Sequence, residues 1–258
     1  MSMMFINGKK TPASSGQTIP VYSPVTGEAY AEIGRGLPAD IDAAVVAARA
    51  SLSGPWGQFS AAERGRVLVR IGQGVLDHID ELSAIEAKDT GKPLALARKD
   101  IEALARYFEF YGGAAGEVHG EVIPYLSGYS VSVVREPCGV VGHIIPWNYP
   151  AQTLGRTLAP ALATGNASVI KPAEDACLTA LRVAEIAHEA GLPAGALNIV
   201  TGFGREAGAA LAGHPGINLI TFTGSPEVGI AIQTAAATHY VKCVLELGGS
   251  DPFIVLND

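Results

Sequence analysis

The sequence predicts an α/β protein whose centre is a mostly parallel β-sheet with helices on both faces. Three observations predict it. Short apolar segments alternate with helix-like segments from residue 139 onward, a long block of helical periodicity precedes them, and residues 5–36 hold short alternating segments between turn residues. Alternating strands and helices are typical of right-handed crossovers, which place helices on both faces of a parallel sheet.

Composition and charge restrict the function. The chain has 258 residues, of which 48% are hydrophobic and 17% are charged, as in ordinary globular proteins. The net charge of -7 disfavours nonspecific nucleic-acid binding, because a phosphate backbone requires clustered Lys and Arg. The apolar runs are short and interrupted by Gly, and the N-terminus lacks the layout of a signal peptide. We therefore expect a cytoplasmic protein with no nucleic-acid or membrane partner.

The cysteines indicate neither disulfides nor a metal site. The three, Cys138, Cys177 and Cys243, lie far apart in the sequence. An odd number at such spacings argues against a disulfide framework and against a CxxC metal site. We expect all three to be buried, small apolar side chains, and we expect no metal.

The first element is a small antiparallel meander over residues 5–36. Residues 22–33 within it are typical of a hairpin, with Pro24 and Gly27 at the turn, because these residue types favour tight turns. The meander begins the N-terminal extension.

Four helices are expected after the meander. Asp40 is the predicted N-cap of the first, and Ser60 with Glu63 forms a capping box for the second, since such side chains satisfy the free N–H groups of a first turn. Gly91 fits the position after the third helix, and Gly112 with the next glycine ends the fourth. The predicted helices cover residues 41–51, 61–78, 80–90 and 94–111.

A second hairpin separates the helices from the sheet. Polar and apolar residues alternate in residues 123–136, with a turn at Ser127 and Gly128, and we expect this hairpin to protrude from the core. The predicted organisation is an N-terminal extension (1–122), the protruding hairpin (123–136) and a sheet domain (137–258).

The sheet domain alternates strand and helix. The predicted strands are residues 140–145, 168–171, 197–200, 219–222 and 241–246, and the helices between them are residues 154–163, 179–190, 206–212 and 227–238. Residues 251–256 are expected to begin a further strand. Ligands of such sheets bind beyond the carboxyl ends of the strands, so the residues that follow each strand are the candidates for a site.

The first strand ends in Pro146-Trp147-Asn148-Tyr149-Pro150. Two prolines restrict the backbone around Asn148, and its side-chain amide has two N–H donors for an oxyanion. The alternative is a rigid turn in which this Asn makes only a local backbone bond.

The second and third strand ends carry weaker signals. Lys171 and Glu174 are three residues apart and could both reach ribose hydroxyls, or could form a surface ion pair of little energetic value. The third end, from Gly202 to Gly208, is a Gly-rich turn one residue longer than the usual dinucleotide fingerprint, and such turns also arise from tight chain reversal alone.

The last two strand ends add a phosphate site and a carboxylate. Ser225 and Pro226 are in the favoured order for a helix start, whose free N–H groups suit a pyrophosphate; the alternative is a capped helix and nothing more. Glu246 lies in an apolar strand, where a desolvated carboxylate would suit a general base; the alternative is a carboxylate bonded to a neighbouring turn.

Taken together, these strand ends resemble a known family. The order PWNYP, KPAE, VTGFG, FTGSPEVG and LELGG is similar to that of the NAD(P)-dependent aldehyde dehydrogenase superfamily, from about Gly36 to the last residue. The resemblance implies a Rossmann-like domain with a long N-terminal extension. It also implies that residues 123–136 take part in the contacts of a homo-oligomer, and that the substrate is a small aldehyde.

The resemblance also implies roles for individual residues. Asn148 would donate to the oxyanion, and Glu246 would be the general base of deacylation. Lys171 and Glu174 would hold the adenosine ribose, with Glu174 favouring NAD over NADP. The residues expected around NAD are Ile144, Ile145, Pro146, Trp147, Asn148, Lys171, Pro172, Ala173, Glu174, Gly204, Phe222, Thr223, Gly224, Ser225, Val228, Glu246, Leu247 and Gly248. Of these, Gly204 and Val228 would flank the adenine, and Ser225 would meet the pyrophosphate.

The family's nucleophile is expected to lie outside this chain. In the family a catalytic Cys follows the Glu by a few dozen residues, so this chain ends before it. Cys243 should point to the face of its strand opposite Glu246. A further departure, Ser250 and Asp251 in place of a commoner Lys and Ser, is expected to be a surface change.

The expected activity is oxidation of an aldehyde to a carboxylic acid through a Cys thioester. A CoA-acylating or acyl-phosphate-forming relative is a rival, but such relatives tend to lack the base at Glu246. A catalytically silent nucleotide-binding module is the alternative from another class. A hydrolase is disfavoured, because the sequence has no Gly-x-Ser-x-Gly elbow, which such enzymes use for their nucleophile.

Overall fold

A seven-stranded sheet forms the centre of the computed structural model, which describes residues 3–257. Its strand order is β11-β10-β7-β8-β9-β1-β2. The strands of the predicted sheet domain are β7 (Val140–Ile145), β8 (Ala167–Pro172), β9 (Leu197–Ile199), β10 (Leu219–Gly224) and β11 (Lys242–Leu247). These five pair in parallel, so the predicted Rossmann-like sheet is confirmed.

The N-terminal strands do not form one meander, and this part of the prediction is wrong. β1 (Met4–Ile6) pairs antiparallel with β9 through Phe5 and Ile199, and β2 (Lys9–Thr11) extends the same sheet. β3 (Thr18–Tyr22) and β4 (Ala29–Gly34) form the expected hairpin as a separate sheet. The cause is burial: every residue of β1 is buried, and its apolar side chains gain more contact against β9 than in an exposed meander.

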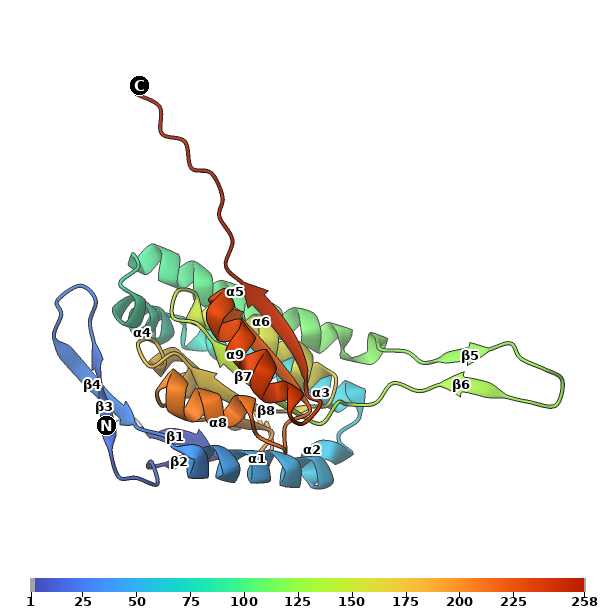
Figure 1. Ribbon diagram of the computed structural model, residues 1–258. Coiled ribbons are helices and arrows are strands. Elements are labelled where there is room, and N and C mark those ends of the chain that lie inside the picture. The colour runs from blue at the N-terminus through green and yellow to red at the C-terminus, as the bar shows by residue number, and fades with distance from the viewer. Residues whose placement is uncertain (1–2, 258) are drawn as a thin grey trace.

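Helices cover both faces of the sheet. One core cluster joins the sheet to α1 (Pro38–Ser53), α8 (Ala209–Ala212) and α9 (Pro226–Ala237). The other joins it to α3 (Ala61–Asp77), α4 (Ile79–Thr90), α5 (Leu94–Ala114), α6 (Pro150–Ala163) and α7 (Leu178–Glu189). In Figure 1, α8 and α9 lie in front of the sheet, and α5 and α6 lie behind it.

Two of the predicted helix ends in the extension are confirmed. Ser60 accepts a hydrogen bond from the backbone N–H of Glu63, whose carboxylate accepts one from the backbone N–H of Ser60, as a capping box requires. Gly91 ends α4 with a φ of 75°, a left-handed conformation that favours glycine. A short helix, α2 (Pro55–Gln58), precedes α3.

Two other predicted helix ends are wrong. Asp40 lies in the first turn of α1, not at its N-cap, and its carboxylate accepts a hydrogen bond from the backbone N–H of Leu37 at 2.8 Å. Gly112 and Gly113 do not end α5, which continues to Ala114 and then into a 3-10 turn (Ala115–Glu117). Gly112 is buried where α5 crosses α3, and an added Cβ would lie 2.9 Å from a methyl group of Val69.

The helices of the sheet domain also differ at their starts. α6 begins at Pro150 instead of residue 154, since a proline at the first helical position costs no hydrogen bond. Residues Gly204–Gly208 form a π-helical turn before α8, in place of one helix from residue 206. α9 follows the predicted cap at Ser225.

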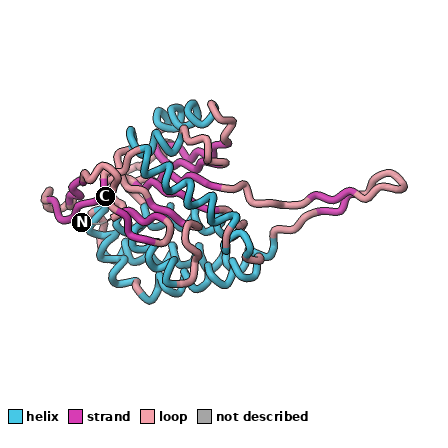
Figure 2. The backbone as a smooth tube through the Cα atoms, turned by 90° about the horizontal axis from the view of Figure 1, so that it is seen from below, coloured by secondary structure: helices cyan, strands magenta, loops and turns pink. Residues whose placement is uncertain are grey.

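The second hairpin protrudes, as predicted. Among the described residues, β5 (Glu121–Ile123) and β6 (Val131–Val133) pair only with each other, and Figures 1 and 2 show them protruding from the body. Gly128 in the connecting turn has a φ of 88°. The division of the chain into parts at residues 122 and 137 stays a prediction.

The predicted strand after residue 251 does not form among the described residues. Residues 248–257 have no regular secondary structure and extend away from the body (Figure 1). A strand requires a neighbour for its N–H and C=O groups, and this segment pairs with none. Ser250 and Asp251 are exposed, as expected of a surface change. Within residues 3–257, no helix has the length and apolar character needed to cross a membrane.

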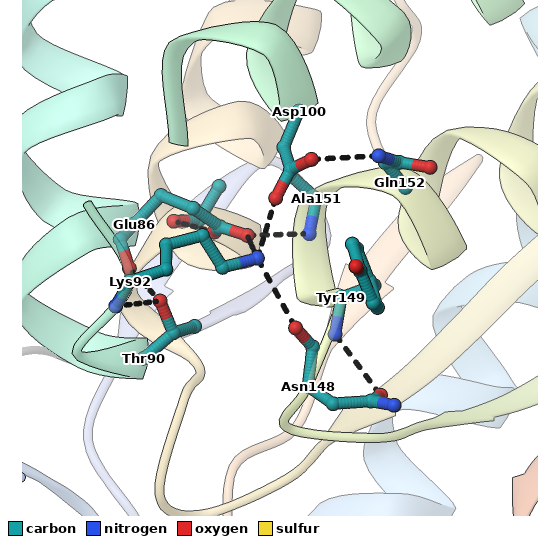
Figure 3. Close-up of polar contacts among 9 residues, drawn as sticks. Glu86, Thr90, Lys92, Asp100, Asn148, Tyr149, Ala151 and Gln152 are labelled. Carbon is teal, nitrogen blue, oxygen red and sulfur yellow. Dashed lines mark hydrogen bonds and ion pairs between the residues drawn. The ribbon is translucent and has the colours of Figure 1, made fainter. Parts of the chain in front are cut away.

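A buried carboxylate links three of the helices behind the sheet. Glu86 on α4 has no exposed surface. Its Oε1 accepts a hydrogen bond from the backbone N–H of Ala151 at 3.3 Å, and its Oε2 accepts one from the hydroxyl of Thr179 at 2.8 Å. The side chain thereby satisfies a free N–H in the first turn of α6 (Figure 3), where a negative charge also suits the helix dipole.

Lys92 and Asp100 complete this polar cluster. The Lys92 ammonium lies 3.7 Å from Glu86, forms an ion pair with Asp100 and donates to the backbone carbonyl of Asn148 at 3.1 Å. Asp100 also accepts a hydrogen bond from Gln152 at 2.6 Å. The cluster therefore joins α4, α5 and α6 to the loop that precedes α6 (Figure 3).

Burial raises the pKa of Glu86 to about 7. The hydrogen bonds from Thr179 and Ala151 oppose this shift, and so does the charge of Lys92. They do not cancel the shift, because the carboxylate is out of water and Lys92 is shared with Asp100.

A buried glycine in the loop before α1 tests the packing of the extension on the sheet. A Cβ on Gly36 would lie 2.2 Å from the carbonyl oxygen of Thr201. We therefore expect Gly36→Ala to lower the free energy of unfolding by about 1–3 kcal/mol through overpacking. Gly113→Ala is the control, since its Cβ meets nothing within 4 Å; it should raise stability by about 0.5–1 kcal/mol by helix propensity. Denaturant unfolding measures both, and equal effects would contradict the packing described here.

The pKa of Glu86 predicts a pH dependence of stability. Its folded-state pKa of about 7 exceeds the ordinary 4.5, so its contribution is complete below pH 4.5 and is lost as the pH rises through 7. Between pH 4.5 and pH 7, the free energy of unfolding of the wild type should therefore fall by about 3 kcal/mol relative to that of Glu86→Gln, at about 1.4 kcal/mol per pKa unit. Unfolding of both proteins across this pH range measures the difference. Parallel stability curves would show that Glu86 does not titrate in the fold.

Candidate active site

The ends of β7, β10 and β11 surround one cavity of about 440 Å³, here called the strand-end cavity. β10 lies between β7 and β11 in the sheet, so loops distant in sequence meet here. The lining residues are Pro146, Trp147, Asn148, Arg156, Thr223, Gly224, Ser225, Pro226, Glu246, Leu247 and Gly248. The structure thus brings together the predicted oxyanion donor, the predicted base and the predicted phosphate-binding helix start.

Asn148 fits both roles that the sequence allowed, the local backbone bond of a rigid turn and the donor to an oxyanion. Its side-chain oxygen accepts a hydrogen bond from the backbone N–H of Tyr149 at 3.0 Å, which is the local bond of a rigid turn. This bond orients the amide and leaves its NH₂ group free of partners in the described part of the chain. Lys92 holds the backbone carbonyl of the same residue. The turn therefore presents two N–H donors at a fixed position, as an oxyanion site requires.

Glu246 lines the same cavity, but it is not desolvated. Its side chain is exposed, so the expectation of a buried carboxylate is wrong in this structure. The cause is its position near the end of β11, an edge strand with no described neighbour on its outer side. The carboxylate is open to water, which a general base of hydrolysis must contact.

Lys171 and Glu174 form an ion pair at the end of β8, with 2.6 Å between Nζ and Oε2. Lys171 is 3% exposed, so this is not the surface ion pair that the sequence also allowed. Burial raises the pKa of Glu174, but the charge and the hydrogen bond of Lys171 lower it by more, with smaller contributions from the backbone N–H groups of Glu174 and Gly204. The pKa therefore lies below its ordinary value. The carboxylate is therefore ionised and fixed next to the β9 loop.

The glycines of the β9 loop serve different purposes. Gly202 has a φ of 149°, and a Cβ there would lie 2.8 Å from the carbonyl of Gly36; it is required by the tight turn. A Cβ on Gly204 would meet nothing within 4 Å, so open space lies beside this residue. A ring system or a sugar can approach the backbone at this point.

The start of α9 is open to solvent. Ser225 is exposed, and its hydroxyl accepts the backbone N–H of Val228 at 3.4 Å. Val228 is 48% exposed. Protein side chains do not plug this helix start, so its remaining N–H groups are available to an anion.

The other predicted cofactor residues fall into three groups. Thr223, Gly224, Leu247 and Gly248 line the strand-end cavity with Pro146 and Trp147. The second group is buried within the strands β7, β8 and β10, and consists of Ile144, Ile145, Pro172 and Phe222. Ala173, Lys171, Glu174 and Gly204 do not line this cavity; they lie farther along the same sheet edge, at the ends of β8 and β9.

None of the three cysteines lies at the strand ends as a nucleophile would. Cys138 precedes β7, at the opposite edge of the sheet, and it is exposed, which contradicts the expectation that all three are buried. Cys177 is fully buried, and burial raises the pKa of its thiol well above its ordinary value. Cys243 packs with the core on the α9 side, on the face of β11 opposite Glu246, as predicted.

A second cavity of about 200 Å³ adjoins the first and was missed from the sequence. It is here called the α6 cavity, and its lining residues are Tyr107, Asn148, Tyr149, Gln152, Thr153, Arg156 and Thr223. Gln152 and Arg156 are four residues apart and share one face of a helix. The sequence analysis missed this shared face because it began the helix at residue 154, whereas α6 begins at Pro150.

Comparisons with known proteins agree with this geometry. Residues 11–258 match the model of the aldehyde dehydrogenase family. Hydroxyisobutyraldehyde dehydrogenase of Mycolicibacterium austroafricanum is 46% identical over 99% of this chain and 51% of that protein. Mitochondrial benzaldehyde dehydrogenase of Antirrhinum majus is 44% identical over 99% of this chain and 48% of that protein.

Solved structures of the same family superpose closely. A putative aldehyde dehydrogenase from Burkholderia cenocepacia has a TM-score of 0.95 and 61% identity, over 96% of this chain and 52% of that chain. An aldehyde dehydrogenase from Bacillus cereus in complex with NAD+ has a TM-score of 0.96 and 40% identity, over 100% of this chain and 53% of that chain.

The chain spans about half the length of the curated relatives that it matches. The match runs through the extension, the hairpin and the sheet domain, and it includes every strand end that lines the strand-end cavity. The chain belongs to the aldehyde dehydrogenase family.

Proposed function

We propose that this chain is the cofactor-binding part of an NAD-dependent aldehyde dehydrogenase that oxidises an aldehyde to the carboxylic acid through a Cys thioester. One observation carries the proposal: Asn148, Glu246 and the Ser225 helix start line a single cavity. An oxyanion donor, a carboxylate base and an anion site are the three elements that such a reaction requires from this part of the protein.

The residues present fit a dinucleotide. The exposed start of α9 suits the pyrophosphate, the open space beside Gly204 suits the adenine, and the fixed Glu174 carboxylate suits the ribose hydroxyls. A carboxylate at that point would repel a 2′-phosphate, which favours NAD over NADP. When bound, NAD supplies the hydride acceptor.

Asn148 stabilises the charge that develops on the aldehyde oxygen. Its NH₂ group is oriented by the bond from Tyr149 and its backbone by Lys92. Donors that are already in place cost no reorganisation as the oxyanion forms, so the turn lowers the barrier to attack on the carbonyl.

Glu246 removes a proton from the water that releases the acid. Its exposed carboxylate at the end of β11 is open to solvent and lies across the cavity from Asn148. Relatives that pass the acyl group to CoA or phosphate need no such base, so this carboxylate favours hydrolysis.

The nucleophile of the proposed reaction is none of the cysteines described above. Cys177 is inaccessible, Cys243 faces away from Glu246, and Cys138 is at the opposite sheet edge. We further propose that the complete protein is a cytoplasmic homo-oligomer. The hairpin exposes Val122, Tyr125, Leu126 and Tyr129 at 65–82%, and these side chains suit contact with a second copy.

The alternative is a nucleotide-binding module that is catalytically silent. The observation in its favour is the lack of a cysteine at the strand-end cavity in the described residues. Both functions require NAD binding, and they differ in turnover.

A calorimetric titration of the 258-residue chain with NAD and NADP tests the cofactor. We expect NAD to bind more tightly than NADP, and Glu174→Gln to weaken NAD about tenfold, because a hydrogen bond to a charged group contributes about 1.5–3 kcal/mol. Adding an aldehyde to the same samples should give no NADH. NADH formation would show that the nucleophile has been misjudged, and lack of NAD binding would contradict the proposal.

Substitutions in a form of the protein that carries the nucleophile test the two roles at the strand-end cavity. Glu246→Gln should keep the first-turnover burst of NADH and lower steady-state turnover by about 100-fold or more. Asn148→Ala should slow the burst itself by about 100-fold. Stopped-flow absorbance measures both phases. Unchanged steady-state turnover of Glu246→Gln would mean that another group activates the water.

A further inference from the structure

Arg156 has no partner in the described part of the chain. Other arginines, such as Arg35, Arg98 and Arg182, pair with carboxylates, and Arg49 and Arg64 bind backbone carbonyls. Arg156 instead lines both the α6 cavity and the strand-end cavity. A guanidinium is always charged and presents five donors, so its placement at the junction of two cavities points to an anionic ligand group.

The walls of the α6 cavity suit a polar ligand. The residues that line it bring hydroxyl, amide and guanidinium groups, and the lining includes no carboxylate and no aliphatic side chain. An apolar substrate would take these groups out of water without replacing their hydrogen bonds, which costs free energy. A ligand with a negative charge would instead satisfy Arg156 and the hydroxyl groups together.

The positions of the donors set the length of the ligand. Asn148 lies two residues before Pro150, the first residue of α6. Arg156 is six residues after Pro150, about 9 Å along the helix axis at about 1.5 Å per residue. Helical side chains lean toward the N-terminus, which brings the guanidinium back toward Gln152. Asn148 and Arg156 both line the α6 cavity of about 200 Å³, so one ligand can reach both. A short chain therefore spans the two ends.

We infer that the substrate is a short-chain aldehyde with a carboxylate at its other end, bound with its carbonyl at Asn148 and its carboxylate at Arg156. This inference rests on the proposed function, because it uses Asn148 as the oxyanion donor. Arg156 is then a specificity-determining residue: it favours an acidic aldehyde over a neutral one of equal length.

Two other partners for Arg156 must be separated from this one. Glu246 lies across the strand-end cavity, but the two side chains form no ion pair within 4.0 Å among the described residues. The cofactor's pyrophosphate is the second candidate, since Ser225 lines the same cavity. A contact with the cofactor would make Arg156 important for NAD affinity and indifferent to the charge of the aldehyde.

A matched pair of ligands tests the inference on the 258-residue chain. 4-Oxobutanoate and its methyl ester share the aldehyde and the carbon chain, and they differ in charge. Ligand-observed NMR in the presence of NAD gives the affinity of each. We expect the acid to bind about tenfold more tightly than the ester, which is about 1.4 kcal/mol.

Three variants locate the effect. Arg156→Gln should weaken the acid about tenfold and the ester less than about twofold, and Arg156→Lys should restore part of the difference, because it keeps the charge but not the planar fork. Arg66→Gln, at an exposed arginine of α3, is the matched control and should change neither affinity. Arg156 is itself exposed, so its substitution leaves the core intact.

The outcomes separate this inference from the proposed function. Equal affinities of acid and ester for wild type, or no binding of either while NAD binds, would overturn the inference alone. A loss of NAD affinity in Arg156→Gln as large as the loss for the acid would assign Arg156 to the cofactor, and would also overturn it. Lack of NAD binding by wild type would overturn the proposed function itself.

Discussion

The cluster of Glu86, Lys92 and Asp100 is the constraint on which the site depends. A carboxylate without exposed surface binds a backbone N–H of α6 and a hydroxyl of α7, and the ammonium beside it binds the carbonyl of Asn148. Buried charged groups are costly unless they are paired and hydrogen-bonded. Because these partners come from α4, α5, α6 and α7, the cluster is satisfied only when the extension is packed on the sheet domain. The conformation of the Asn148 turn therefore depends on helices far from it in sequence.

The sheet places the remaining groups. Parallel strands end at one edge, so the loops after β7, β10 and β11 form one cavity although about a hundred residues separate Asn148 from Glu246. The next two strands, β8 and β9, carry the ion pair of Lys171 with Glu174 and the open glycine, Gly204. The proposed dinucleotide would lie along this edge, with its redox end at β7, β10 and β11 and its adenosine end at β8 and β9.

The errors of the sequence-based predictions have a common origin. β1 pairs with β9 instead of joining the meander, and α5 continues through two glycines because the buried one lies against α3. α6 begins at Pro150, and not at the predicted residue 154. The late predicted start left Gln152 outside the helix, so its shared face with Arg156 was not recognised. Glu246 is exposed because β11 is an edge strand. Each error concerns a neighbour from another part of the chain.

The sequence by itself determined the parallel α/β sheet, the protruding hairpin and the identity of the polar residues after each strand. These features follow from local patterns: the periodicity of apolar residues, capping residues and turn residues act over a few positions. Only the tertiary structure decided which of those residues share a cavity, and that Lys92 binds the backbone of the Asn148 turn. It also decided that Arg156 lies beside this turn without a partner among residues 3–257. Such features depend on contacts between segments that are distant in the chain, and local sequence patterns cannot predict them.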